Sequence, residues 1–532
     1  MTKLETSGKI GKREIKESIK VASIVFLSRI TGFLRELVVA YLFGTSWIAS
    51  SLVVATRLPN MFRRLLGEGT LSSVFVSLYS RERVKNEKRA REFASRAYSS
   101  VMTLAWSLSI LAVLLAPLLV RLITFDFASS GRRIFLSISL SRVTLPYIGI
   151  STGVAFLAGL LNSHGYFYQP MFSQVILNFA MIVFALVAVV ASFPLRWAAF
   201  LVVAGFLVGG IAQLAYQRLL VKKKVERGSP FLKYRVGFDY RDPLVRELLL
   251  KTLPGVIGLA AYEANVVIDT LLAWHYSESA VSALYYANRI YLLPVGVIGA
   301  SYYTVILPLF ARNAEMKKSQ ELSRNVYFSL LTLLFLTMPL VWLTIFNSKD
   351  VVAVVFMRGN FSLLSVHQTS SALNMLSFAI PFAVSLKVLV SLFYSHKDTV
   401  TPMKGSVLAM VSNSVLDFTF IKPMGYTGLA LASALSVLIN FSYLFLMALK
   451  KNLVYSSKLL SFGFKSLIVS LFSFVSFVLF HGAFGVLSEK MNLAFPKWNY
   501  LLVFTVFLAL FYVLYLALGY FLFFRSRFTE ET

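Results

Sequence analysis

The chain has 532 residues, of which 57% are hydrophobic and 14% are charged, and it contains no cysteine. Soluble proteins carry about 25% charged residues, so this composition indicates a membrane protein. Its apolar runs of about 20 residues fit helices rather than the ~10-residue alternating strands of a membrane barrel. The net charge of +28 lies mainly in loops between these runs, which is typical of topology signals rather than of nucleic-acid binding. The absence of cysteine excludes disulfides and thiol chemistry.

The apolar windows predict an all-α polytopic membrane protein with about 14 transmembrane helices, because each window has about the length that crosses a bilayer. The windows lie at 19–43, 47–66, 97–121, 134–160, 169–191, 195–219, 247–273, 283–309, 325–347, 367–394, 402–421, 426–449, 461–482 and 499–524. Lys and Arg are concentrated in alternate connections, including 81–96 and 218–251. The positive-inside rule therefore predicts that both termini are cytoplasmic. No small-residue cleavage site follows the basic N-terminus, so a cleaved signal peptide is not expected.

An internal repeat divides the chain. Residues 163–171 are SHGYFYQPM and residues 395–403 are SHKDTVTPM, an offset of 232, while SLYSR at 77–81 and PLFAR at 308–312 match at 231. Internal repeats are a common transporter architecture. We predict two pseudo-symmetric six-helix lobes plus two C-terminal helices. The predicted domains are a cytoplasmic N-terminal segment 1–18, an N-lobe 19–219, a cytoplasmic linker 220–246, a C-lobe 247–450, and two further helices with a cytoplasmic tail at 451–532.

The repeat also aligns two histidines, His164 and His396. A metal site or a proton relay is one interpretation, but both lie in cytoplasmic loops without a second ligand nearby in the sequence. The other interpretation is that each side chain caps a turn.

Several arginines lie within the apolar windows: Arg29 and Arg35 in the first, Arg63 near the end of the second, and Arg289 in the second half of the chain. A charge near the membrane centre costs at least ~2.5–3.5 kcal/mol, so such residues normally face a partner or a wet cavity. Arginine is suited to phosphate because its planar fork binds oxyanions bidentately and stays charged. These residues predict an anionic substrate gripped between two bundles, with Ser28 on the helix face of Arg35.

Two alternatives remain for these charges. Arg35 and Glu36 could neutralise each other within the bundle, and Arg63, Arg64 and Glu68 could extend to lipid headgroups from the cytoplasmic end of the second span.

A second group of polar residues is rich in oxygen. Glu263 and Asp269 lie in the seventh window, Asn413 and Asp417 share a helix face in the eleventh, and Ser433 lies in the twelfth. Carboxylate, amide and hydroxyl oxygens suit a hard cation such as Na⁺, or a proton carrier. Hydrogen bonding between helices is the alternative.

No Walker A sequence, HExxH motif or nucleophile elbow is present. We therefore expect a protein that is not an enzyme. A membrane glycosyl- or phosphotransferase would need an acidic or histidine site at a membrane face, and the sequence shows none.

The segment 28–69 contains SRITGFLRE, FGTS and RLPNMFRRLLGEG, and it resembles the N-terminal signature of the MurJ (MviN) family of lipid II flippases. The resemblance continues through PYI and LLNSHGYF at 146–167, ALYYANRIYLLPVGVIG at 283–299, VFMRGNF at 355–361 and FYSHKDTVTPMK at 393–404. It implies the multidrug/oligosaccharidyl-lipid/polysaccharide exporter fold, in which twelve helices form two lobes around a cationic cavity and two more shape a groove for a lipid tail.

The resemblance also implies a function. Members of this family move the undecaprenyl-pyrophosphate-linked disaccharide-pentapeptide, lipid II, across the bacterial cytoplasmic (inner) membrane for peptidoglycan synthesis and cell-wall biogenesis. By correspondence with the family pattern, the substrate-binding residues are Ser28, Arg29, Arg35, Arg63 and Arg289, and the residues that supply gating or cavity charge are Glu36, Arg64, Glu68 and Asn288. The family's sodium site corresponds to Asp269, Asn413, Asp417 and Ser433. We expect lipid II and membrane lipids as partners, no nucleic acid, and no cofactor other than a candidate Na⁺.

Three positions depart from the family pattern. Ser50 and Asn288 each replace an aspartate, and Glu263 replaces a glutamine-like residue. The first two changes remove acids near cavity arginines. They leave room for an exporter of another lipid-linked oligosaccharide or of a drug, which is the runner-up hypothesis. A pump for hydrophobic cations would, however, be expected to carry acids rather than arginines in its cavity.

Overall fold

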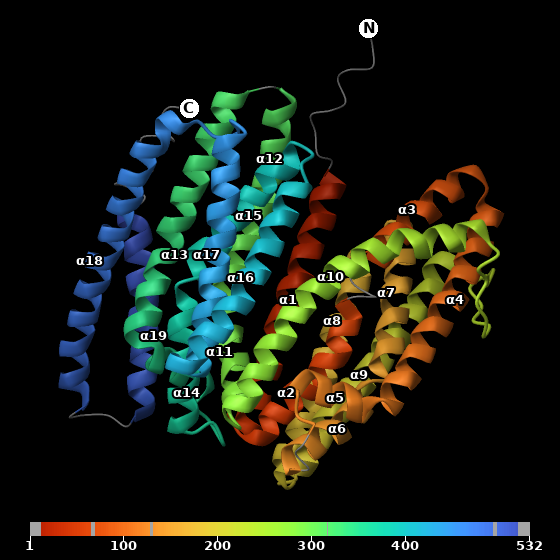
Figure 1. The fold of residues 1–532 in the computed structure, drawn as a ribbon, viewed down its shortest axis with the longest axis horizontal. Coiled ribbons are helices and arrows are strands. Elements are labelled where there is room, and N and C mark those ends of the chain that lie inside the picture. The colour runs from red at the N-terminus through yellow and green to blue at the C-terminus, as the bar shows by residue number, and fades with distance from the viewer. Residues whose placement is uncertain (1–11, 65–69, 128–130, 317, 493–496, 520–532) are drawn as a thin grey trace. The chain divides into compact units, whose positions relative to one another are not determined.

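The computed structural model describes residues 12–64, 70–127, 131–316, 318–492 and 497–519. Throughout this part of the chain the regular secondary structure is helical, and it contains no strand (Figure 1). The predicted all-α class is confirmed, and every predicted window contains at least one helix. Glu68 and residues 1–11 lie outside the described residues.

Eight of the described helices are long and apolar enough to cross a membrane, or nine if α14 (Leu363–Ser377) and α15 (Ile380–Ser395), which are bent by 43°, form one span. The other predicted windows fall on helices that are shorter or less apolar. Helix α2 (Trp47–Phe62), for example, has only 16 residues and contains Pro59. The chain is a multi-pass membrane protein.

Packing divides the chain into unit 1, Met1–Ser279 with Arg358–Phe361, and unit 2, Ala280–Met357 with Ser362–Thr532. This division falls after α10, one helix later than the predicted boundary between the lobes. The helices of unit 1 are α1 (Lys12–Phe43), α2, α3 (Thr70–Lys85), α4 (Glu87–Leu114), α5 (Ala116–Thr124), α6 (Arg132–Thr144), α7 (Tyr147–Ser163), α8 (Tyr168–Val190), α9 (Leu195–Val221), the π-helical turn η2 (Lys222–Glu226) and α10 (Pro243–Tyr276).

Unit 1 has two apolar cores. In one, α1 packs along α8, and α8 along α9. The α8–α9 approach is close because Gly209 has no side chain: a Cβ there would lie 3.1 Å from the Leu177 carbonyl oxygen. In the other core, the rings of Phe75 and Phe156 join α3 to α7 with centroids 4.3 Å apart. These cores fix the helices that carry the charged residues of unit 1.

The short segment 358–361 packs on the end of α1. The backbone N–H of Asn360 donates to the Tyr41 carbonyl at 2.8 Å, and its side-chain amide donates to the Leu42 carbonyl at 2.7 Å. These bonds satisfy carbonyls that the end of a helix leaves without intrahelical partners. Gly359 has φ +57°, and a Cβ there would lie 2.6 Å from the Tyr41 carbonyl oxygen, so only glycine allows this approach.

Unit 2 contains α11 (Ala280–Pro294), the π-helical turn η3 (Val295–Gly299), α12 (Ala300–Glu315), α13 (Ser319–Phe356), α14, α15, α16 (Val400–Met424), α17 (Tyr426–Lys450), the 3₁₀ turn η4 (Ser456–Lys458), α18 (Leu459–Asn492) and α19 (Lys497–Gly519). Helix α19 is fastened to α13 by aromatic side chains. Tyr515 stacks on Phe335 with centroids 4.5 Å apart and donates to the Phe335 carbonyl at 3.0 Å. The two C-terminal helices thus form an addition to α13.

The helix boundaries repeat at the spacing of the sequence motifs. Helices α2 and α11 end at residues 62 and 294, α7 and α15 end at 163 and 395, and α8 and α16 begin at 168 and 400. The internal repeat therefore extends from the motifs to the order and ends of the helices, and α10 corresponds to α1.

Candidate functional site

The first charged group lies where α1 meets α8. The Arg35 guanidinium donates to the Glu36 carboxylate through Nη2 and to the Asn178 side-chain oxygen at 3.0 Å through Nη1. Asn178, which is buried, in turn donates to the Ser28 carbonyl at 3.2 Å. The Arg35–Glu36 ion pair agrees with the neutralisation alternative, but the Asn178 bridge was not visible in the sequence.

The second charged group joins α2 to α10. Arg64 Nε lies 2.9 Å from the Glu263 carboxylate, whose side chain is 2% exposed. Arg57 donates to the Val266 carbonyl at 3.3 Å. The sequence grouped Glu263 with the candidate cation ligands, but the structure instead pairs it with an arginine.

Arg63 connects these two groups electrostatically. Its Nε donates to the Asn60 side chain at 3.3 Å. Arg63 also interacts electrostatically with four further side chains of unit 1: Arg35, Arg64, Tyr147 and Glu263. We call Arg35, Arg57, Arg63 and Arg64 the inner arginine cluster. With Glu36 and Glu263 as its two acids, the cluster keeps a surplus of two positive charges.

The remaining predicted substrate residues have different surroundings. Ser28 is half-buried, whereas Arg29 is exposed. In unit 2, Arg289 is partly buried, donates to the Tyr285 hydroxyl at 2.7 Å and lies over the Tyr285 ring. Its neighbour Asn288 is exposed.

The predicted cation ligands are distributed over three helices. On α16, Asn413 and Asp417 are buried on one face, as predicted, and the Asn413 amide donates to the Asp417 carboxylate at 2.6 Å. Ser433 is on α17, which packs against α16, and Asp269 is on α10 in unit 1. Carboxylate, amide and hydroxyl oxygens suit Na⁺, but the Asn413–Asp417 bond equally fits the hydrogen-bonding alternative.

The two repeat histidines both follow helix ends, but only the His396 side chain bonds to a carbonyl of its own turn, as the turn-capping interpretation requires. His164 follows α7 and lies 3.1 Å from the Tyr79 hydroxyl, while His396 follows α15 and its Nδ1 lies 3.0 Å from the Leu392 carbonyl. Within the described residues, no three His, Cys, Asp or Glu side chains gather as a metal site would require.

Ser50 replaces the family's aspartate in a fully buried position. Its hydroxyl donates to the Glu278 carbonyl at 2.7 Å. The serine at this position is therefore satisfied by a backbone carbonyl just after the end of α10.

Comparison with known proteins identifies the family. A model of the family described as lipid II flippase MurJ matches residues 39–495, which is most of the chain. The chain belongs to the MurJ family. A probable lipid II flippase MurJ of Rhizobium tropici is 31% identical over 81% of this chain and 80% of that protein. One from Vibrio cholerae is 29% identical over 82% and 83%, respectively.

Solved structures show the same fold. The inward-closed conformation of lipid II flippase MurJ matches with a TM-score of 0.76 and 24% identity, covering 94% of this chain and 99% of that one. An inward-facing MATE multidrug transporter of the MOP superfamily matches with a TM-score of 0.65 and 14% identity, covering 79% and 94%. The predicted exporter fold is therefore confirmed.

Sequence reasoning missed the contacts of Asn178 and Arg57 in the site, and it missed the bonds from Asn360 to the end of α1. A polar residue in the apolar window 169–191 was a signal for Asn178, and Arg57 lies in the charged stretch 28–69 that the sequence singled out. The bonds from Asn360 depend on backbone geometry that the sequence does not encode locally.

Proposed function

We propose that this protein flips lipid II from the inner to the outer leaflet of the bacterial cytoplasmic membrane, without covalent chemistry, as a step of peptidoglycan biosynthesis. The observation that carries the proposal is the inner arginine cluster within the apolar helices of a MurJ-family chain. Loops rich in Lys and Arg, such as 81–96, support a topology with both termini in the cytoplasm.

The cluster suits a pyrophosphate for a physical reason. An anionic headgroup cannot cross hydrocarbon without a polar path, and guanidinium groups bind phosphate oxygens in pairs. Glu36 and Glu263 form ion pairs with Arg35 and Arg64, respectively. These ion pairs position the arginines, and the cluster still keeps its surplus of two positive charges. The pyrophosphate would compete with the two carboxylates for the same guanidinium N–H donors.

The transport cycle that we propose is alternating access. Arg29 and Ser28 on α1, and Arg289 on α11, would add contacts to the headgroup. Arg289 is already oriented by Tyr285.

Release of a tightly held anion requires a driving force. The membrane potential supplies ~2.3 kcal/mol per charge per 100 mV. We propose that Asp269, Asn413, Asp417 and Ser433 hold a coupling Na⁺. Flipping by the wild type should then slow when K⁺ replaces Na⁺, and the same rate in both salts would refute Na⁺ coupling.

Flipping of fluorescent lipid II in proteoliposomes tests the proposed function. Arg35→Gln should lower the rate about tenfold or more, because a hydrogen bond to a charged group contributes ~1.5–3 kcal/mol. Lys85→Gln, which removes an exposed positive charge on α3, should leave the rate unchanged. Wild-type flipping by Arg35→Gln would contradict the role of the cluster. Failure of the gene to rescue cells depleted of their own lipid II flippase would contradict the function itself.

A second candidate is the export of another undecaprenyl-pyrophosphate-linked oligosaccharide. The buried Ser50 favours it, because its hydroxyl bonds to the backbone where the family pattern has an acid. Faster flipping of such a lipid than of lipid II in the same vesicles would support this alternative.

A further inference from the structure

The segment between α9 and α10 follows the surface of α4 in an extended conformation. We call residues 231–241 the strap. Four of its backbone N–H groups bond to hydroxyls of α4: Lys233 to Ser95 at 3.2 Å, Arg235 to Ser99 at 3.1 Å, Gly237 to Thr103 at 3.1 Å and Asp239 to Ser100 at 3.0 Å. The spacings of the first three bonds match, because two extended residues advance about 6.6 Å and four helical residues about 6 Å.

The position of the strap along α4 places it at the membrane surface. It lies beside residues 95–103, where the basic segment 81–96 gives way to the apolar window 97–121. Non-helical backbone near hydrocarbon requires hydrogen-bond partners, and the hydroxyls of α4 provide them. The strap is therefore held at the depth of the lipid headgroups on the side predicted to be cytoplasmic.

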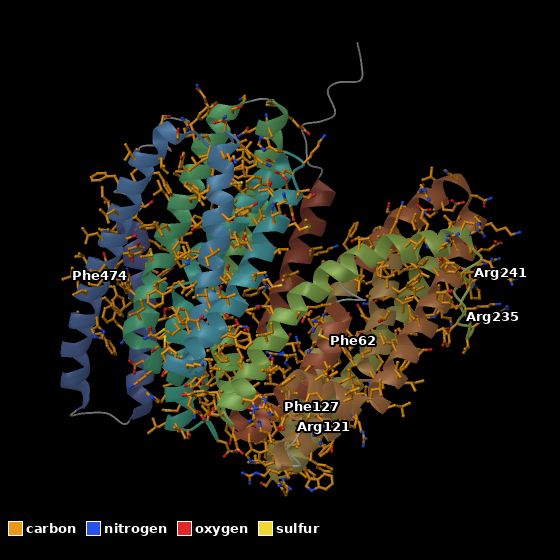
Figure 2. All side chains as sticks on the ribbon, viewed as in Figure 1. Phe62, Arg121, Phe127, Arg235, Arg241 and Phe474 are labelled. Carbon is orange, nitrogen blue, oxygen red and sulfur yellow. The ribbon has the colours of Figure 1, made fainter. Side chains whose placement is uncertain are left out.

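The exposed side chains of the strap are those of an interfacial segment. Tyr234, Phe238 and Tyr240 are exposed, and Val236 is 82% exposed. Aromatic side chains interspersed with basic ones are typical of the membrane–water interface. Figure 2 shows Arg235 and Arg241 on this segment at the edge of unit 1.

The acids near the strap are directed toward α4. Asp242, which is buried, lies 2.9 Å from Arg89, and Asp239 lies 3.2 Å from Arg96. Among the described residues, no carboxylate lies within ion-pair distance of Arg246. Because these acids face α4, the side of the strap that faces away from α4 carries a net positive charge.

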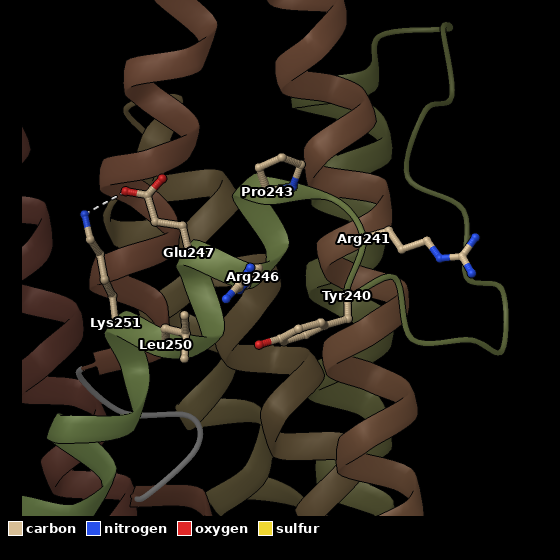
Figure 3. A pocket seen from close by; sticks show the side chains of 7 residues that line it. All are labelled: Tyr240, Arg241, Pro243, Arg246, Glu247, Leu250 and Lys251. Atoms are coloured by element: carbon tan, nitrogen blue, oxygen red, sulfur yellow. Dashed lines mark hydrogen bonds and ion pairs between the residues drawn. The ribbon is translucent and has the colours of Figure 1, made fainter.

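A groove of about 670 Å³ lies between the strap and the first turns of α10 (Figure 3). Arg246 lines it together with the apolar surface of Leu250 and Tyr240, and Arg241 borders it with its guanidinium directed away from these side chains (Figure 3). The Arg246 guanidinium lies 5.5 Å from the centre of the Tyr240 ring, which orients it.

The carboxylate that lines this groove, Glu247, forms ion pairs with two basic side chains. Glu247 lies 2.7 Å from Lys251 and 3.0 Å from Arg81. The groove thus combines the Arg246 guanidinium with apolar walls at headgroup depth, and Arg241 adds a second positive charge at its rim.

We propose that the strap and this groove bind the phosphodiester headgroup of an anionic phospholipid from the cytoplasmic leaflet. Arg246 contacts the phosphate within the groove, Arg241 attracts the anionic headgroup from the rim, and the apolar wall at Leu250 and Tyr240 receives the start of the acyl chains. This site is separate from the inner arginine cluster, and its occupation does not depend on which substrate is flipped.

Native mass spectrometry of the full-length protein with equal amounts of phosphatidylglycerol and phosphatidylcholine tests the proposal. The wild type should retain phosphatidylglycerol preferentially. The double variant Arg241→Gln/Arg246→Gln should bind it about 30-fold more weakly, from the usual contribution of two basic residues at an anionic surface. The control Lys222→Gln/Lys223→Gln removes two exposed charges of the same linker and should stay within about twofold of wild type.

Tyr240 provides an independent check. Tyr240→Phe keeps a ring for Arg246 and should bind normally, whereas Tyr240→Ala should weaken binding. Melting temperatures of all variants show whether the fold is retained.

Three outcomes would overturn the proposal. The first is equal binding of both lipids by the wild type. The second is equal loss in the two double variants, which would indicate diffuse electrostatics. The third is displacement of phosphatidylglycerol by millimolar inorganic phosphate or preferentially by undecaprenyl pyrophosphate, which would make the groove a site for free phosphate or for substrate, respectively.

Discussion

The two repeats share helix boundaries but differ in where they place charge. Arg57 and Arg289 lie 232 residues apart at corresponding positions of α2 and α11. The other arginines of the inner cluster have no such counterpart: Val267, Val295 and Gly296 stand at the positions that correspond to Arg35, Arg63 and Arg64. The surplus of positive charge therefore belongs to the first repeat.

The reverse holds for the oxygen-rich residues. Asn413 and Asp417 on α16 correspond to Met181 and Ala185 on α8, both of which are buried in an apolar core. One backbone arrangement thus carries anion-binding chemistry in the first repeat and cation-type ligands in the second. Helix order is set by apolar periodicity, which tolerates such exchanges at single positions.

The corners after α7 and α15 diverge in the same way. At the first, burial, assisted by Arg83, lowers the pKa of His164 to about 4. At the second, burial raises the pKa of Asp398, but hydrogen bonds from Lys451 and Thr401 outweigh it and hold that pKa well below its usual range. The two turns lie at corresponding positions of the repeats, but different polar side chains surround them.

The largest effect that we predict concerns the Arg64–Glu263 pair, in which an arginine of the first repeat meets a carboxylate on α10, the first helix of the second repeat. Arg64→Leu leaves a buried carboxylate without its ion-pair partner and should destabilise the protein by ~3 kcal/mol. The double variant Arg64→Leu/Glu263→Leu should recover much of this loss, as measured by thermal unfolding in detergent. Equal destabilisation of the single and double variants would contradict a buried pair.

A smaller effect is expected at Asn178. Asn178→Ala removes the acceptor of Arg35 and the link to the Ser28 carbonyl, and should cost ~1–3 kcal/mol. Met410→Ala, at the corresponding position of the second repeat, should cost less because that half-buried side chain takes no part in a polar bridge. Unfolding of both variants under the same conditions tests the difference, and a larger loss for Met410→Ala would reverse the comparison.

The smallest effect concerns pH. The folded-state pKa of His164 is lowered to about 4, so the unfolded chain binds a proton that the folded one does not between about pH 6.5 and 4. Its contribution to stability is therefore present above pH 6.5 and is lost as the pH falls toward 4. Because the group is only partly buried, we expect less than ~1 kcal/mol. His164→Gln should flatten this part of the melting-temperature profile, and Tyr79→Phe should not, since burial is the main cause.

The sequence predicted the helical class, the windows, the repeat and the family because each depends on apolar composition or on motifs that stay contiguous in the chain. It also placed Asn413 and Asp417 correctly on one helix face, since their spacing alone decides that. These are local properties.

The partners of individual charges could not be predicted in the same way. Glu263 lies six residues from Asp269 in the sequence, which suggested a shared role, yet it pairs with Arg64 from a helix about 200 residues earlier. Asn360 bonds to Tyr41 and Leu42 across an even longer separation. Such contacts depend on tertiary packing, which a single sequence does not reveal.

The regular spacing of the strap restricts how the linker can change in length. Surface loops usually tolerate insertions freely. Here every second amide is committed to a hydroxyl of α4, so one added residue would direct the amides beyond it away from these hydroxyls. Two added residues would restore the register. Linker length in related chains should therefore vary in steps of two along the strap, and freely only at its ends.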